Sequence, residues 1–133
     1  MKLTRENVLW LAGYFDGEGC LSRYRPNEHS GWKAGIKSTD EDLISKVVAI
    51  AGGSVYFERK NDKNPNHKDI WSWELRDQAK LYALTAAIYP FMSQRRQKRI
   101  EEFFLYFRTH KTTPGNPRGT AKDQVGNRLL AAA

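Results

Sequence analysis

The amino-acid sequence predicts an α+β fold, in which one antiparallel four-stranded sheet carries its helices on a single face. Apolar residues recur at helical spacing in four stretches, and four short runs of alternating polarity occur in two pairs. These elements follow one another as two units of a helix and a strand pair, with two further helices at the end. The second face of such a sheet is free to meet a ligand.

The first unit is expected over the first 38 residues. A helix over residues 5–16 begins after Thr4 as its N-terminal cap and ends at Gly17 with Gly19. Its core side carries apolar residues at helical spacing: Val8, Leu11 and Phe15. Strands over residues 20–25 and 32–38 follow, because both runs alternate and are separated by the turn formers Pro26, Asn27, Ser30 and Gly31.

The second unit repeats this order. Thr39 and Asp42 resemble a capping box for a helix over residues 40–51, which carries Leu43, Val47 and Ile50 and ends at Gly52 and Gly53. Strands are expected over residues 54–60 and 70–76. Asp77 then caps a third helix that runs to Ile88, and a fourth helix follows Ser93 with four apolar residues on one side: Ile100, Phe103, Phe104 and Phe107.

The composition is that of a folded, basic, intracellular protein. The chain has 22 Lys and Arg against 15 Asp and Glu, a net charge of +7 that favours polyanions as partners. Of this charge, +6 falls after residue 93, where a solvated helix face remains the alternative reading. The single cysteine, Cys20, excludes a disulfide framework or a cysteine zinc site. We expect neither a secretory signal nor a membrane span. The 133 residues are expected to form a core domain over 1–108 and a basic, partly flexible extension over 109–133.

Alternation along the strands predicts which side chains occupy the open face of the sheet. The first two strands would place there Arg23, Arg25, Lys33 and Lys37. The fourth strand would add Ser72, Glu74 and Arg76, and would turn Trp71, Trp73 and Leu75 to the core. Basic and polar side chains on an exposed sheet suit the reading of a nucleic-acid groove.

A stripe of small residues distinguishes the first helix. Leu9, Ala12, Gly13, Asp16 and Gly17 share one side of it. Because a glycine inside a helix costs about 1 kcal/mol relative to alanine, Gly13 indicates close approach of another backbone. A second copy of the same helix would fit, as in an isologous dimer. Packing of Gly13 against the sheet of its own chain remains equally open.

Two acids stand where they weaken the helix. Asp16 and Glu18 lie at its C-terminal end, where the helix dipole disfavours negative charge. Such a conflict between stability and sequence is typical of a functional site. If the stripe pairs two helices, the acids of both copies meet and can hold a divalent cation beside a nucleic-acid surface. Solvated acids in a turn are the alternative.

The stretch from Leu11 to Gly19 reads Leu-Ala-Gly-Tyr-Phe-Asp-Gly-Glu-Gly and resembles the motif of the LAGLIDADG homing endonucleases. Five of its letters match the name, and Glu18 stands at the second acid. The expected αββαββα order also resembles that family over about the first 107 residues. A single motif implies the homodimeric type, a double-strand DNA endonuclease that acts at a long, nearly palindromic site during intron or intein mobility.

The resemblance also implies roles for individual residues. Glu18 would be the catalytic carboxylate that binds Mg²⁺, with the Gly17 carbonyl in the metal shell and Ca²⁺ supporting binding without cleavage. Asp16 would order the helix ends. The family places a basic residue after a Pro-hydrophobic pair, here Pro90 and Phe91, so that Gln94, Arg95 or Arg96 would lie near the scissile phosphate. Ser38 would position the attacking water.

The DNA contacts expected on the sheet come from Arg23, Arg25, Lys33, Lys37, Ser72 and Arg76, with Lys60 and the basic extension on phosphates. The leading hypothesis is therefore a magnesium-dependent, site-specific DNA endonuclease. The alternative is a noncatalytic binder of the same fold, either an RNA-splicing maturase or a transcription regulator.

Overall fold

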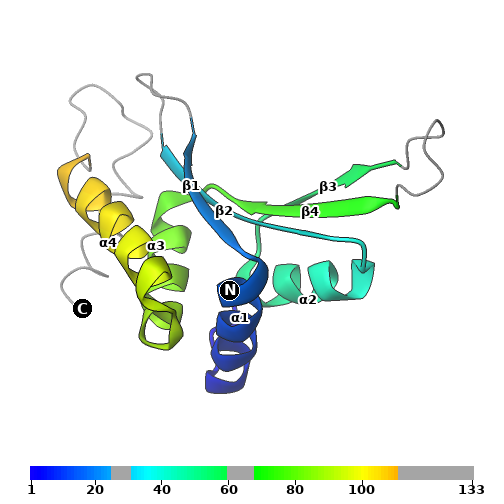
Figure 1. Ribbon diagram of the computed structural model, residues 1–133, viewed down its shortest axis with the longest axis horizontal. Coiled ribbons are helices and arrows are strands. Elements are labelled where there is room, and N and C mark those ends of the chain that lie inside the picture. Colours follow the sequence, from blue (N-terminus) through cyan, green and yellow to red (C-terminus); the bar gives the residue numbers. More distant parts are fainter. Residues whose placement is uncertain (25–30, 60–67, 111–133) are drawn as a thin grey trace.

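The computed structural model describes residues 1–24, 31–59 and 68–110, and these residues form the predicted α+β arrangement (Figure 1). In chain order the elements are α1 (Arg5–Glu18), β1 (Cys20–Tyr24), β2 (Gly31–Ser38), α2 (Glu41–Ala51), β3 (Ser54–Glu58), β4 (Ile70–Leu75), α3 (Gln78–Ile88), the 3₁₀ turn η1 (Tyr89–Phe91) and α4 (Gln94–Thr109). Within these residues, no helix has both the length and the apolar character that crossing a bilayer requires.

The four strands form one antiparallel sheet in the order β1-β2-β4-β3. The two hairpins therefore meet at its centre, where Gly35 of β2 pairs with Cys20 of β1 on one side and with Glu74 of β4 on the other. All the helices lie on one side of the sheet (Figure 1). The fold thus leaves one sheet face uncovered by helices, as the sequence predicts.

The core lies between the sheet and the helices. Alternate residues of the central strands enter it, namely Trp32, Ala34 and Ile36 of β2 with Trp73 and Leu75 of β4. The predicted helix residues Val8, Leu11 and Phe15 are buried against them, as are Ile100, Phe103 and Phe107 of α4. The indole of Trp73 donates to the Gly52 carbonyl at 2.6 Å and so fixes the end of α2 on β4.

The first helix is longer than its sequence predicts, and this places Glu18. The side chain of Thr4 accepts from the Asn7 amide at 3.2 Å, which confirms the predicted cap. At the other end, however, the helix runs through Gly17 and is capped by Gly19, whose amide donates to the Phe15 carbonyl at 2.8 Å. A Cβ atom at position 19 would collide with the Phe15 ring. Glu18 is therefore the last helical residue.

Two other predicted boundaries change. The N-terminal cap of α2 is Asp40, so the capping box assigned to Thr39 is wrong; instead, the Ser38 hydroxyl accepts from the Asp40 amide at 2.9 Å. The Asp77 cap of α3 is confirmed by a hydrogen bond from the Lys80 amide at 3.2 Å. Strands β3 and β4 end before the predicted residues 60 and 76, whereas the predicted end of the first strand at residue 25 lies outside the described residues. The predicted extension over 109–133 lies almost wholly outside the described residues and stays a prediction.

Candidate nucleic-acid interface and carboxylate site

The uncovered face of the sheet contains a central hollow of about 440 Å³. Its polar lining comes from the end of α1 and from three strands: Glu18, Cys20, Ser22, Lys33, Lys37, Ser72 and Glu74. The strand register brings them together, because Ser22 pairs with Lys33 and Lys37 pairs with Ser72. Paired residues of neighbouring strands point to the same face. We call this surface the open face.

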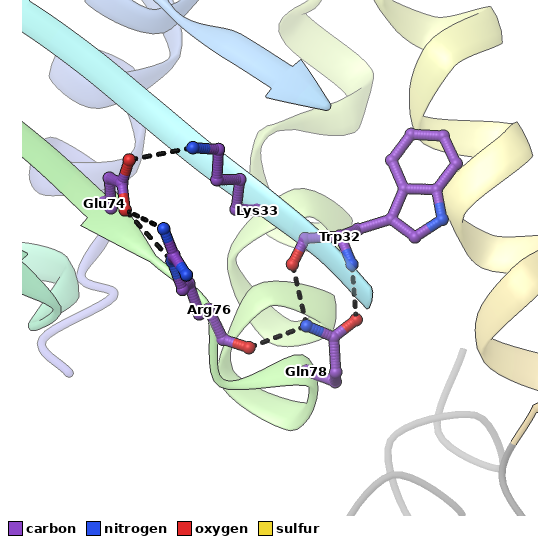
Figure 2. Close-up of polar contacts among 5 residues, drawn as sticks. All are labelled: Trp32, Lys33, Glu74, Arg76 and Gln78. Atoms are coloured by element: carbon purple, nitrogen blue, oxygen red, sulfur yellow. Dashed lines mark hydrogen bonds and ion pairs between the residues drawn. The ribbon is translucent and has the colours of Figure 1, made fainter. Parts of the chain in front are cut away.

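Lys33 and Lys37 lie on the open face as predicted, and Arg76 follows β4 beside them. The Glu74 carboxylate joins two of these cations, because Lys33 Nζ lies 2.9 Å from its Oε1 and Arg76 Nη2 lies 2.8 Å from its Oε2 (Figure 2). Partial burial raises the pKa of Glu74, but the hydrogen bonds and charges of Lys33 and Arg76 outweigh it, so this pKa lies below its ordinary value. Glu74 is therefore ionised at neutral pH.

The predicted position of Arg23 on the open face is wrong. Arg23 pairs with the buried Trp32, and its guanidinium carbon lies 5.1 Å from the centroid of the Tyr106 ring in α4. It thus points to the helix side of the sheet. The sequence holds the signal for this placement, because buried Leu21 precedes Arg23 by two residues and must share its face.

The same parity places Cys20, Ser22 and Tyr24 on the open face, and none of the three is among the residues predicted there. The Arg76 guanidinium carbon lies 5.1 Å from the centroid of the Tyr24 ring, which confirms that Tyr24 faces the fourth strand. Two further predicted contacts, Arg25 and Lys60, lie outside the described residues.

Two predicted serines occupy their expected places in the strands, but their contacts bear on their predicted roles. Ser72 lies under the open face but is only 6% exposed, and its hydroxyl has no hydrogen-bond partner among the described residues. Ser72 nevertheless lines the central hollow, and its contact with DNA stays a prediction. Ser38 ends β2 and its hydroxyl binds the Asp40 amide, so the structure does not bring it into the central hollow. Its role in positioning water stays a prediction.

A second, lateral hollow of about 420 Å³ lies between β1 and the start of α4. It is lined by Cys20, Leu21, Arg95, Arg96, Lys98, Arg99 and Glu102. Cys20 borders both hollows, so the basic end of α4 lies next to the carboxylate end of α1. Four cations in the first turns of a helix oppose its dipole, which indicates a surface that attracts anions. Arg95 and Arg96 both line the hollow, whereas Gln94 does not.

Asp16 faces the start of α4. Its Oδ1 accepts from the Ser93 amide at 3.0 Å. Hydrogen bonds from the backbone and hydroxyl of Ser93, helped by the charges of Arg96 and Arg95, hold the pKa of Asp16 below its ordinary value. The contact matches the expectation that Asp16 orders helix ends.

One side of α1 is free within the described chain. A Cβ atom added to Gly13 or Gly17 would meet nothing within 4 Å, so the packing of Gly13 against its own sheet is excluded for the described residues. Leu9 on the same side is 44% exposed. Ala12, in contrast, is 1% exposed and belongs to the core of its own chain. Its predicted place in a dimer interface is therefore wrong. We call Leu9, Gly13 and Gly17 the free side of α1.

The candidate oxygen donors for a metal ion lie in the last turn of α1. Glu18 is exposed, and the Gly17 carbonyl belongs to the last turn of α1, where carbonyls lack helical partners. Both are oxygen donors that suit a hard cation such as Mg²⁺. In the described part of the chain, however, no three acidic, histidine or cysteine residues converge on one point.

Comparison with known proteins finds structures of similar fold but no match by sequence. No family model matches the sequence, and no curated protein matches it. Among solved structures, the intron-encoded homing endonuclease I-CeuI with DNA has a TM-score of 0.59 at 14% identity, over 79% of this chain and 55% of that one. The homing endonuclease I-CvuI with DNA gives 0.59 at 13%, over 97% and 83%. The archaeal intron-encoded homing endonuclease I-Vdi141I with DNA gives 0.55 at 11%, over 96% and 84%.

Every one of these structures is a homing endonuclease, and each aligns with most of this chain. The sequence motif in α1 and the structural matches therefore point to the same fold. This chain has the fold of the LAGLIDADG homing endonucleases.

Proposed function

We propose that the protein is a site-specific, Mg²⁺-dependent double-strand DNA endonuclease that acts as a homodimer. One observation carries the proposal: Glu18 ends α1 at the point where the free side of that helix meets the open face of the sheet. An acid at this position weakens the helix, but it suits a cation held beside a phosphodiester. The similar structures were solved as DNA complexes, which supports the same class of substrate.

The free side of α1 supplies the dimer contact of this proposal. Gly13 and Gly17 lie one turn apart and leave open space, so a second helix can approach the backbone closely. Isologous pairing about a two-fold axis sets the same residues of both copies against each other. The two Glu18 side chains then lie at one end of the seam and complete the site that one copy holds in part. Asp16 flanks this seam and holds α4 in place.

Each residue near the seam has a chemical role. Glu18 and the Gly17 carbonyl of both copies would hold Mg²⁺, which supplies Lewis-acid stabilisation of the charge that develops on the phosphate. Arg95 and Arg96 add electrostatic stabilisation, because an arginine stays protonated and cannot act as a general base at neutral pH. Ca²⁺ would support binding without cleavage. A complex of I-CvuI with its own target was obtained in the presence of 2 mM Ca, which supports the use of Ca²⁺ for binding.

The open face would lie in the major groove of DNA. Lys33, Lys37 and Arg76 supply its cations, and an arginine can bind guanine through two hydrogen bonds. Arg25, Lys60 and the basic residues after position 108 would contact phosphates. Because its substrate is DNA, the protein would act inside the cell. Two of the similar structures are of intron-encoded endonucleases, which supports a role in the mobility of an intron or intein.

A selection from randomised duplex DNA tests the proposal. The full chain is bound to the library in Ca²⁺, the retained DNA is amplified, and the enriched pool is transferred to Mg²⁺, with a parallel sample in a chelator. We expect enrichment of one nearly palindromic sequence and cleavage of both strands near its centre only in Mg²⁺. Enrichment without cleavage would instead indicate a DNA-binding regulator. No enrichment would refute DNA specificity and direct the search to structured RNA, as for a maturase.

A further inference from the structure

The Glu74 carboxylate is the centre of a network of ion pairs on the open face. A negative charge on a surface that binds DNA repels phosphate and so lowers affinity, which means that Glu74 calls for an explanation. Its side chain is 19% exposed. Oε1 accepts from Lys33 Nζ at 2.9 Å, while Oε2 accepts from Arg76 Nε at 3.0 Å and lies 2.8 Å from Arg76 Nη2 (Figure 2). Both oxygens are thus used to hold cations.

Arg76 is fixed at three points. Glu74 binds its guanidinium through Nε and Nη2, and the guanidinium carbon lies 5.1 Å from the centroid of the Tyr24 ring. Its backbone carbonyl accepts from Gln78 Nε2 at 2.7 Å. Gln78 is itself anchored, since it also donates to the Trp32 carbonyl at 2.8 Å and accepts from the Trp32 amide at 3.1 Å (Figure 2). Both the main chain and the side chain of Arg76 are therefore held.

The mode of attachment decides what Arg76 can bind. A guanidinium carries its five N–H donors on a rigid fork, and a carboxylate on the Nε and Nη2 edge leaves the edge between the two Nη atoms for another partner. The Arg76 side chain remains 52% exposed. Guanine offers two acceptors, O6 and N7, to such an edge in the major groove, whereas adenine places a donor at the corresponding position. A free arginine would instead be able to bend toward any phosphate.

We propose that Glu74 is a positioning residue that holds Arg76 for reading a guanine and keeps Lys33 beside it. The acid would lower overall affinity for DNA but raise discrimination between bases, which is how a repulsive charge adds specificity at an interface. This inference rests on the proposed function, because it requires that the open face meets DNA. Glu74 would thus determine the base preference at one base pair of each half-site through Arg76, without itself contacting the DNA.

The test compares sequence preference in the full chain, in three single variants and in one double variant that combines Glu74→Gln with Arg76→Lys. Glu74→Gln keeps the size of the side chain and removes its charge. Glu58→Gln is the matched control. Glu58 is exposed at the end of β3 and lies on the same face by strand parity, so its substitution removes an equal charge. Arg76→Lys keeps a cation but loses the bidentate fork. Each protein is bound to the randomised library in Ca²⁺, and its melting temperature is measured alongside.

We expect wild type and Glu58→Gln to enrich the same guanine in each half-site. Glu74→Gln should bind DNA as tightly or more tightly but lose about tenfold of the preference for guanine over adenine at that position. Arg76→Lys should lose the same preference, and adding Glu74→Gln to it should cause no further loss. That absence of additivity separates positioning through Arg76 from a general structural effect.

Two results would overturn the inference. If Glu74→Gln keeps the guanine preference, or loses preference at every position as a destabilised protein would, Glu74 does not position Arg76. If wild type enriches a sequence with no guanine that depends on Arg76, the assignment of that base is wrong. A wild type that enriches no sequence at all refutes the proposed function itself, which distinguishes the two failures.

Discussion

The Oδ1 atom of Asp16 accepts a hydrogen bond from the Ser93 amide at 3.0 Å and so joins two helix ends that lie 77 residues apart in the chain. Ser93 precedes α4, whose first amides lack helical partners and whose first turns carry four cations. An acid from the end of α1 therefore stabilises the start of α4. The contact also fixes the lateral hollow against the carboxylate end of α1.

Asp16→Ala should lower the melting temperature at pH 7, because it removes this acceptor. The pKa of Asp16 is lowered in the folded state, so its contribution is fully present above the unfolded pKa, about 4, and disappears as the pH falls through the lower folded pKa. Thermal unfolding from pH 7 to 2.5 measures this, with Asp16→Asn as the control that keeps an acceptor oxygen. A difference between wild type and Asp16→Ala that stays constant with pH would contradict the assignment.

Glu18→Gln should abolish cleavage while DNA affinity stays equal or rises, because the variant loses a charge that repels phosphate. The expected fall in cleavage rate in Mg²⁺ is at least about a hundredfold. Glu6→Gln is the matched control, since Glu6 is an exposed acid in the first turn of the same helix. Cleavage by Glu18→Gln at the wild-type rate would remove Glu18 from the metal site.

Gly13→Leu should break the dimer without unfolding the monomer. The position has open space within the chain, and leucine is favoured over glycine inside a helix by up to about 1 kcal/mol. Sedimentation should therefore show monomers with an unchanged or higher melting temperature. Ala49→Leu, on the exposed surface of α2, serves as the control and should remain dimeric. A Gly13→Leu protein that is still a dimer would refute the α1 seam.

Gln78→Ala should destabilise the fold by about 1–3 kcal/mol, because it leaves the amide and carbonyl of buried Trp32 without their partner. Urea unfolding measures this loss. Lys80→Ala, in the same turn of α3 and exposed, is the control and should change stability by less than about 0.5 kcal/mol. Equal stabilities of the two variants would show that Gln78 does not clamp β2 to α3.

The sequence by itself determined the order of the elements, the helix cap at Thr4, and the position of the LAGLIDADG-like motif on α1. These features depend on residues within one or two turns of each other, so periodicity and capping residues are enough to predict them. The end of α1 was the local exception. Gly17 can continue a helix, and in the structure α1 ends instead at Gly19, whose backbone is extended and packs against the Phe15 ring.

Only the tertiary structure decided which face each side chain occupies and which partners it meets. The charge of Arg23 favours the open face, but Arg23 shares its strand parity with buried Leu21. Its side chain therefore lies on the helix side of the sheet, against Tyr106. Ala12 fits a small-residue stripe in the sequence, yet α1 turns it into its own core. Tyr24, Lys33 and Glu74 come from three separate strands, and register, which depends on the whole sheet, brings them together around Arg76.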